Sequence, residues 1–288
     1  MLSSVFFRSR VLRALLGLTI ACLGFATAAD EVAVYTFDDE PAEVSANSGV
    51  LVLDQSGMNQ NGTLYSGAEL FKEGDDGALQ LNGGTGFAKM ILRKTRFDTA
   101  PFSVEFNILL DSLKDGMVMG KKLAEEPDAA GWVVETANKA QEIHFTFSDG
   151  QQSDALSVPL KNPQEWSHVV MVRDGKTVTV YVNGQLAGSK TSPVFGKDLQ
   201  SPGDYFYLGK ILGKLRSIHG KLDEVIIRNG SLTAEEVEKA YRAAMDKNIK
   251  KKRAAHLKRM SGVPQIRFRP LWCCTTDSTP IPERSRRI

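Results

Sequence analysis

Cysteine is almost absent from this chain, which has three in 288 residues. Cys22 lies near the N-terminus, and Cys273 and Cys274 are adjacent near the C-terminus, so the long region between them has none. Adjacent cysteines rarely bridge each other, so these two offer no framework for a disulfide-rich fold. The central region of about 200 residues must fold without disulfides, and its size is sufficient for that.

Long apolar runs are missing after residue 28, so no later segment is expected to cross a membrane. The N-terminus differs: three arginines precede a short apolar run at 14–25, and Ala26-Thr27-Ala28 follows it. This order predicts a secretory signal peptide over residues 1–28, cleaved near Ala28. A lipid anchor on Cys22 fits less well, because Thr19 stands where a leucine-like residue is needed. We expect the protein to be secreted, periplasmic or on the cell surface.

The third absence is a helical pattern: before Thr233, apolar residues do not recur at the spacing of an amphipathic helix. This region instead holds about a dozen short segments with β-strand character, bounded by Gly, Pro, Asn or Asp. The clearest pair lies at 166–184, where alternating valines are punctuated by Asp174-Gly175 and Asn183-Gly184. The sequence therefore predicts an all-β fold, a two-sheet antiparallel sandwich over residues 30–232.

A helix is predicted to follow the sandwich. Thr233 and Glu236 form a capping box, and Leu232 and Val237 can pack together as a hydrophobic staple. The apolar face thins beyond Asp246. We predict a helix over 233–260 that is docked at its start and basic at its end, and no regular structure over 261–288.

Charge divides the chain unevenly. Residues 246–288 contain 12 lysines and arginines against three acidic residues, so the formal net charge of +2 conceals an acidic domain with a basic tail. The tail could contact an anionic surface or fold back on the acidic domain, although a solvated extension is the simpler interpretation. Because the chain is predicted to be exported, we expect no nucleic-acid partner.

Several segments together resemble one family. WSHVVMVR, DGKTVTVYVNG and KLDEVIIRNGSLTAEEVEKAY occur in the order seen in the laminin G-like, concanavalin A-like lectin/glucanase jelly-roll family, and LDQSGMNQNGT and GALQLNG resemble two earlier stretches. The resemblance covers residues 30–245. It implies a jelly-roll sandwich with carbohydrate binding, adhesion or protein contact as its role, often beside a calcium ion. Glycoside hydrolases and lyases share this fold, so the fold alone does not determine the function.

A pair of catalytic carboxylates is also lacking. Hydrolases of this fold place them at alternate positions of one strand, typically as E-x-D-x-x-E, which does not occur here. Glu105 stands alone in FSVEFN, Asp111 falls outside its alternation, and the adjacent Asp223 and Glu224 should point to opposite faces. We predict a non-catalytic protein, with a glycan-cleaving hydrolase or lyase as the alternative.

Calcium, if bound, would need carboxylate and amide oxygens from several loops. Asp38 and Asp39 end the first strand, Asp54 opens an Asn-rich loop, and Asp223 lies on the closing strand. The first and last strands of a jelly roll often pair, so Asp38 or Asp39 could meet Asp223. A calcium site at Asp38, Asp54 and Asp223 is one hypothesis; an Asx turn at Asp54 and solvated turn residues are the other.

Aromatic side chains are the candidate sugar-stacking residues. The set that we consider is Tyr65, Trp132, Tyr205 and Tyr207, although an aromatic in an alternating strand is more often part of the core. Trp166 is predicted to be core and His168 structural. We expect an exported carbohydrate-binding or adhesion module that contacts a glycan or an extracellular or cell-envelope protein; a protein-interaction module is a further alternative.

Overall fold

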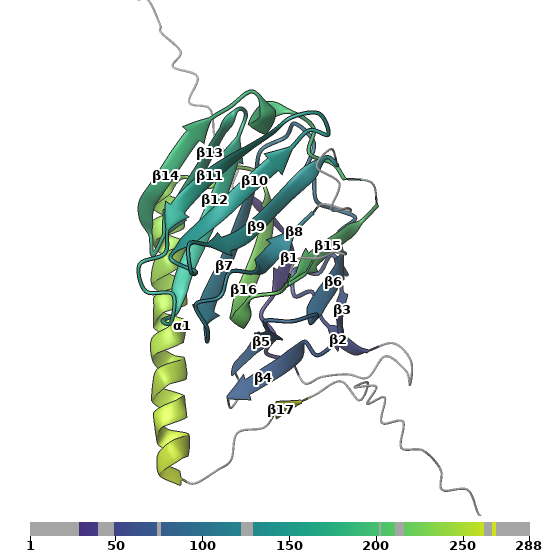
Figure 1. The fold of residues 1–288 in the computed structure, drawn as a ribbon. Helices are drawn as coiled ribbons and strands as arrows, with labels where there is room; N and C mark the ends of the chain where they lie inside the picture. The colour runs from purple at the N-terminus through teal and green to yellow at the C-terminus, as the bar shows by residue number, and fades with distance from the viewer. Residues whose placement is uncertain are drawn as a thin grey trace, which may run out of the picture.

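The computed structural model describes residues 29–39, 49–73, 76–121, 129–201, 203–210, 216–261 and 267–268, with only the backbone from residue 248 on. Two antiparallel sheets pack face to face, and one helix lies outside them (Figure 1). The all-β sandwich with a C-terminal helix is therefore confirmed. The predicted signal peptide over 1–28 lies outside the described residues.

We call the first sheet sheet A. The strand β1 pairs with one of its central strands, and the helix lies on its outer face. Its strands, in spatial order, are β14 (Gln185–Thr191), β13 (Thr177–Val182), β12 (Ser167–Asp174), β7 (Phe102–Leu110), β16 (His219–Asn229), β5 (Asp76–Asn82), β4 (Glu69–Glu73) and β17 (Arg267–Phe268), with β1 (Asp30–Tyr35) also paired to β16.

The second sheet, sheet B, has eight strands. In spatial order they are β11 (Ser153–Pro159), β10 (Glu142–Ser148), β9 (Gly131–Ala137), β8 (Met117–Gly120), β15 (Tyr205–Leu208), β6 (Phe87–Ile91), β3 (Gly62–Tyr65) and β2 (Val50–Val52). A short 3-10 helix, η1 (Val194–Gly196), connects β14 to the segment before β15.

The predicted hairpin at 166–184 forms between β12 and β13. Val178 and Val180 point into the core, and Arg173 pairs with Val178 in register. Asn183 and Gly184 have φ of 52° and 73°, the left-handed values that favour Asn-Gly in a tight turn. This turn connects β13 to β14, so the second turn expected in the 166–184 segment is present.

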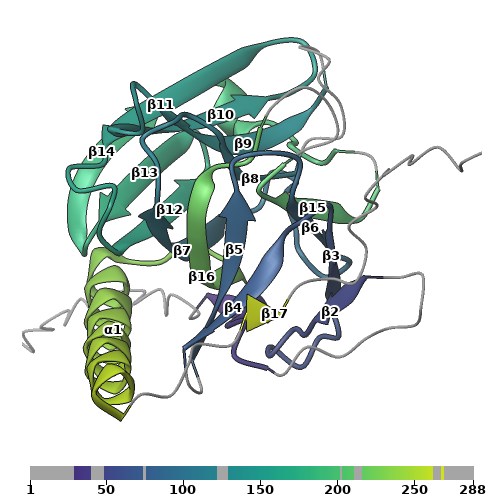
Figure 2. The ribbon, with the colours of Figure 1, turned by 60° about the horizontal axis from the view of Figure 1, so that its bottom comes forward.

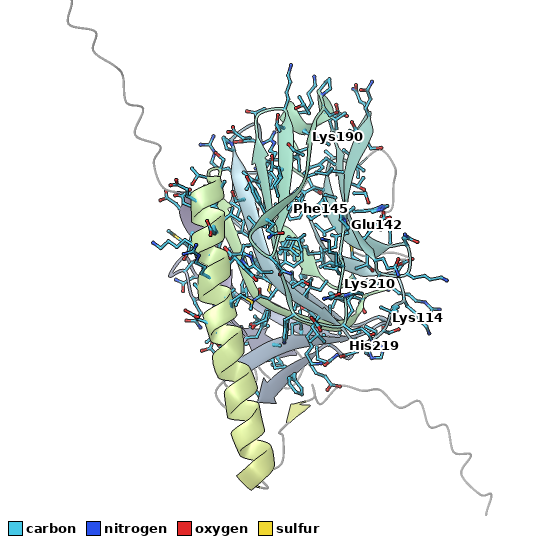
Figure 3. All side chains as sticks on the ribbon, turned by 90° about the vertical axis from the view of Figure 1, so that its left-hand side faces the viewer. Lys114, Glu142, Phe145, Lys190, Lys210 and His219 are labelled. Carbon is cyan, nitrogen blue, oxygen red and sulfur yellow. The ribbon has the colours of Figure 1, made fainter. Side chains whose placement is uncertain are left out.

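The core between the sheets is rich in aromatic side chains. Phe97, Phe102, Trp132 and Phe206 form one group with ring centroids 5.0–5.9 Å apart. Phe145, labelled in Figure 3, is also buried between the sheets. Burial of rings of this size is the main stabilising contribution that a disulfide-free sandwich can draw on.

The other face of the hairpin packs on the helix. Val170 and Val172 form a cluster with Val237 of α1 (Ala234–Ser261), beside Leu232. Trp166, predicted to be core, is half-buried and precedes β12, so that prediction is wrong. Alternation placed the valines on one face, but it could not indicate that a helix covers that face.

The helix begins as predicted. Thr233 N–H donates to Glu236 Oε2 at 2.8 Å, and Glu236 N–H donates to Thr233 Oγ1 at 3.2 Å, which is the capping box. Tyr241 lies where a Cβ at position 184 would stand, 2.7 Å from its ring, so Gly184 permits close packing of the helix on the hairpin. Figures 2 and 3 show α1 lying along sheet A, and Figure 1 shows its C-terminal half running past the strands.

The helix is not a membrane span: among the described residues, no helix is long and apolar enough to cross a bilayer. We expected no regular structure over 261–288, whereas Arg267 and Phe268 pair with Phe71 and Leu70 of the edge strand β4. The other residues of the basic tail beyond 268 lie outside the described structure.

Candidate functional site

A row of aromatic side chains lies on the outer face of sheet B, opposite the helix. This row results from the alternation of side chains along each strand. Phe206 and Leu208 of β15 enter the core, so Tyr205 and Tyr207 point outward. In β6, Ala88 and Met90 enter the core, which turns Phe87 and Lys89 outward. We call the set Tyr65, Phe87, Lys89, Tyr205 and Tyr207 the tyrosine face.

Three rings of the tyrosine face, one from each of three neighbouring strands, contact one another. Tyr65 stacks on Phe87 with centroids 5.0 Å apart and planes inclined by 18°. Phe87 lies 6.1 Å from Tyr207, and the ammonium of Lys89 lies 3.5 Å from the centroid of Tyr205. Three of the four predicted stacking residues are therefore brought together.

The members of the tyrosine face differ in exposure. Tyr65 and Tyr205 are 37% and 38% exposed, whereas Tyr207 is 2% exposed and packs with Met117. Burial raises the pKa of the Tyr207 hydroxyl, and the nearby Tyr205 and Tyr65 raise it further. Tyr207 thus forms the floor, and Tyr65 and Tyr205 supply the accessible rings.

A polar row continues from the tyrosine face toward the other edge of sheet B. Glu135 on β9 pairs in register with Met117 on one side and with His144 on the other. Glu142 and Ser157 lie beyond it, and Figure 3 shows Glu142 on the side away from the helix. The face thus combines exposed rings with hydrogen-bonding side chains, the composition typical of sugar sites.

Ser157, His144 and Glu142 do not form a catalytic triad. Ser157 Oγ donates to Glu142 Oε2 at 2.7 Å, and His144 Nε2 lies 3.2 Å from the same oxygen. A triad requires the imidazole between the hydroxyl and the carboxylate, so that it can take the hydroxyl proton. Here the carboxylate is in the middle, and the serine has no base to activate it.

Trp132, the fourth predicted stacking residue, lies on the opposite face of sheet B. Its side chain is 1% exposed and packs among Phe97, Phe102 and Phe206. The expectation of an exposed ring is therefore wrong for Trp132. The alternation of its strand is compatible with either face, and only the facing aromatic cluster decides between them.

Asp54 holds its loop together. Its Oδ1 accepts hydrogen bonds from the N–H groups of Val34 and Ser56 at 2.9 and 3.0 Å. Its Oδ2 accepts bonds from Ser56 Oγ and Gln60 N at 2.8 and 2.9 Å. This is the Asx-turn hypothesis, extended by a bond to β1, and both carboxylate oxygens already have protein donors.

Asp38 and Asp223 both lie near one lysine of the helix, Lys247. Lys247 Nζ of α1 lies 2.8 Å from Asp38 Oδ2 and also binds Glu224. Burial alone would lower the pKa of Lys247, but the bonds to Asp38 and Glu224 and the charges of Glu224 and Asp223 raise it above its ordinary value. An ammonium therefore occupies the space between these carboxylates.

Asp223 and Glu224 depart from the prediction that adjacent residues point to opposite faces. A β-bulge interrupts the pairing of β16 with β7 between Asp223 and Ile226, and Glu224 has φ of 49°. A bulge breaks strand alternation, so both carboxylates can act on one cation. The prediction failed because the bulge has no glycine or proline to indicate it.

The three aspartates do not fit a calcium ion as they are arranged here. Both carboxylate oxygens of Asp54 accept hydrogen bonds from β1 and from its own loop, while Asp38 and Asp223 lie near the Lys247 ammonium. Calcium needs six to eight oxygens around one point. Within the described part of the chain, no three acidic, histidine or cysteine side chains are grouped for a metal.

Replacing Lys247 with methionine should loosen the helix. The variant leaves Asp38 and Glu224 without their shared cation, so we expect about 1–2 kcal/mol less protection for the amides of α1 before residue 247. Because the pKa of Lys247 is raised, its contribution is complete at neutral pH and is lost only as the pH rises above about 10.4. Hydrogen exchange measures this directly.

The control for this prediction is Lys239→Met, which removes an exposed lysine of the same helix. No ion pair joins Lys239 to another described residue, so its amide protection should stay within about 0.5 kcal/mol of the wild type. Equal loss in both variants would contradict the role given to Lys247.

Glu105, the lone carboxylate of β7, is buried beneath the helix. His168 Nε2 lies 3.0 Å from its Oε1, and Arg228 Nη1 donates to its Oε2 at 2.6 Å. Burial would raise the pKa of Glu105, but the bonds and charges of His168 and Arg228 outweigh burial and hold the pKa below its ordinary value. The predicted structural role of His168 is in accord with these contacts.

A separate groove of about 280 Å³ opens at one end of the sandwich. Its lining includes Lys161, Asn183, Gln185 and the exposed Leu186. Lys161 follows β11, Asn183 is in the β13–β14 turn, and Gln185 and Leu186 begin β14. The tyrosine face lies on β3, β6 and β15. The groove and the tyrosine face are therefore different places.

Residues 82–238 match the family model of the concanavalin A-like lectin/glucanases superfamily, and the chain belongs to that family. The resemblance of the hairpin and the closing strand is thereby confirmed.

Particular relatives are more distant. Over 69 residues the chain is 35% identical to the trypomastigote decay-accelerating factor of Trypanosoma cruzi, which covers 24% of this chain and 73% of that protein. Among solved structures, it resembles the botulinum neurotoxin serotype D binding domain (TM-score 0.55, 14% identity, 75% of this chain and 51% of that one). The binding domain of Paraclostridial Mosquitocidal Protein 1 is similar to the same degree (TM-score 0.56, 14% identity, 75% and 52%).

A further similar structure is the binding domain of botulinum neurotoxin DC in complex with SialylT (TM-score 0.56, 11% identity, 74% and 51%). The chain spans about half the length of these solved chains. At such identities the likeness establishes the sandwich fold and leaves the ligand open.

Proposed function

We propose that this protein is an exported, non-catalytic glycan-binding module whose site is the tyrosine face. The observation that carries the proposal is the group of outward rings Tyr65, Phe87, Tyr205 and Tyr207 over three neighbouring strands. Buried aromatics need no ligand to explain them, but Tyr65 and Tyr205 leave more than a third of their surfaces in solvent.

The chemistry of the face suits a sugar. A sugar ring has an apolar face of C–H groups that packs on an aromatic ring, and its hydroxyls need donors and acceptors at the side. The tyrosine hydroxyls and the neighbouring Glu135 supply them. One of the similar structures is a complex with SialylT, which is in keeping with this class of ligand.

Two contacts support a non-catalytic role. Glu105 is held ionised under the helix, where no substrate reaches it, and Ser157 shares Glu142 with His144 instead of bonding to the imidazole. The export part of the proposal rests on the predicted signal peptide at 1–28, which leads the chain to extracellular or cell-envelope glycans.

A glycan array tests the proposal. We expect the wild type to retain at least one glycan, Tyr205→Ala to lose it, and Tyr205→Phe to keep most of the signal because the ring remains. Leu186→Ala, in the end groove, is the matched control and should bind as the wild type does. Loss of signal in Leu186→Ala alone would move the site to the groove.

The same array separates the alternatives. Binding should survive EDTA, because the aspartate oxygens are committed to protein donors. Shortened glycan products that vanish in Glu142→Gln or Glu105→Gln would establish a hydrolase or lyase instead. Retention of no glycan, together with capture of a protein free of glycans, would favour an interaction module.

A further inference from the structure

The ammonium of Lys89 occupies the position that a stacking ligand would need. It lies 3.5 Å from the centroid of the Tyr205 ring, on the same outward face. Lys89 comes from β6, where it pairs in register with Tyr207 on one side and Thr63 on the other. A ligand that packs on Tyr205 must therefore displace this ammonium or engage it.

No described carboxylate forms an ion pair with Lys89. The nearest acidic residue along the neighbouring strand, Asp204, pairs with Arg93 at 3.4 Å. Glu135 lies on β9, three strands from β6, which is about 14 Å at the usual strand spacing. That separation exceeds the screening length of about 8 Å at physiological salt, so Glu135 does not neutralise Lys89.

We propose that the tyrosine face selects acidic glycans, with a sugar ring on Tyr205 and its carboxylate or sulfate group on Lys89. This inference rests on the proposed function and names the class of ligand. As the sugar stacks, the Lys89 ammonium leaves the ring and pairs with the acidic group. A cation over a partly exposed ring is held weakly, and the four-carbon lysine stem is flexible, so the exchange requires no movement of the strands.

An acidic group on the ligand gives the displaced Lys89 ammonium a new partner, which a neutral sugar does not. A neutral ligand would remove the ammonium from the ring and leave it with no partner in the described structure. An acidic ligand exchanges the ring contact for a charge-assisted hydrogen bond, which is the stronger of the two. The face therefore discriminates by charge as well as by shape.

Two matched pairs of probes test the inference with the full chain: oligogalacturonate against its methyl ester, and dextran sulfate against dextran. We expect at least tenfold tighter binding of the acidic member in one pair or both. The carboxylate pair and the sulfate pair report separately which acidic group is recognised. In Lys89→Gln the acidic and neutral members of each pair should bind equally.

Lys239→Gln, which removes the same charge from the helix on the opposite side, is the control and should keep the preference. Lys89→Arg should also keep it. A preference that survives in Lys89→Gln would place recognition on the basic tail or elsewhere and overturn the inference. Equal binding of both members by the wild type would overturn it too. The proposed function would stand in either case if Tyr205→Ala still abolished binding, and would fall if Tyr205→Ala had no effect.

Discussion

Substitution of Arg173 by methionine is expected to lower the free energy of unfolding by about 3–5 kcal/mol. This arginine lies at the end of β12 with its side chain fully buried. Its Nε donates to the carbonyl of Phe195 at 2.6 Å, its Nη2 to that of Lys197 at 2.8 Å, and its Nη1 to the carbonyls of Asp98 and Ala100 at 2.8 and 2.6 Å.

The expected loss of unfolding free energy is large because the four hydrogen bonds of Arg173 join separate segments of the chain. One guanidinium ties the loop before β7 to η1 and the residue after it, and methionine would leave four carbonyls without a donor. Arg173→Lys should give an intermediate loss, because an ammonium has three donors where the guanidinium has five.

Urea denaturation of the purified domain measures the difference. Arg96→Met is the control: Arg96 bridges Asp98 at 3.1 Å in the same loop, but most of its side chain is in solvent, so a loss under about 1 kcal/mol is expected. Similar losses in the two variants would contradict the account of Arg173.

Replacing Glu105 with glutamine should cost about 2–4 kcal/mol at pH 7, because two charge-assisted hydrogen bonds become weaker and Arg228 keeps its charge in a buried place. Glu31→Gln is the matched control. It binds Arg228 at 2.9 Å from a half-exposed position and should cost under about 1 kcal/mol.

The effect of Glu105→Gln should depend on pH. The pKa of Glu105 is lowered in the folded protein, so its stabilising contribution is complete above the ordinary glutamate value of about 4.3 and is lost as the pH falls through the lower folded value. Denaturation curves of the two proteins should therefore converge below about pH 4 and stay apart from pH 5 to 8. A constant difference over the whole range would contradict the ionised state of Glu105.

The fold could be predicted from the sequence because alternation and turn residues are local signals. Apolar runs in the sequence predict strands at 102–110 and 205–208, and β7 and β15 have these bounds. Asn183-Gly184 forms the expected turn. The edge strand β14 was not predicted, since GSKT gives no alternation of apolar residues, and the two-residue β17 depends entirely on its pairing with β4.

The site could be predicted only in part. Tyr65, Tyr205 and Tyr207 were candidates as aromatics, but their common face depends on the order β15, β6, β3, which joins segments far apart in the chain. Phe87 and Lys89 were missed, although the alternation of FAKMI could have indicated their outward direction. The Lys247 cluster was missed because it needs both a helix docked on sheet A and a bulge in β16.

The central claim is that the tyrosine face binds a glycan, and calorimetric titration of the double variant Tyr65→Ala/Tyr205→Ala with the glycan best retained by the wild type tests it most directly. Loss of two ring contacts at the centre of a site predicts at least thirtyfold weaker binding, which corresponds to about 2 kcal/mol, with an unfolding midpoint close to that of the wild type. Wild-type affinity in the double variant would show that the glycan binds elsewhere on the protein.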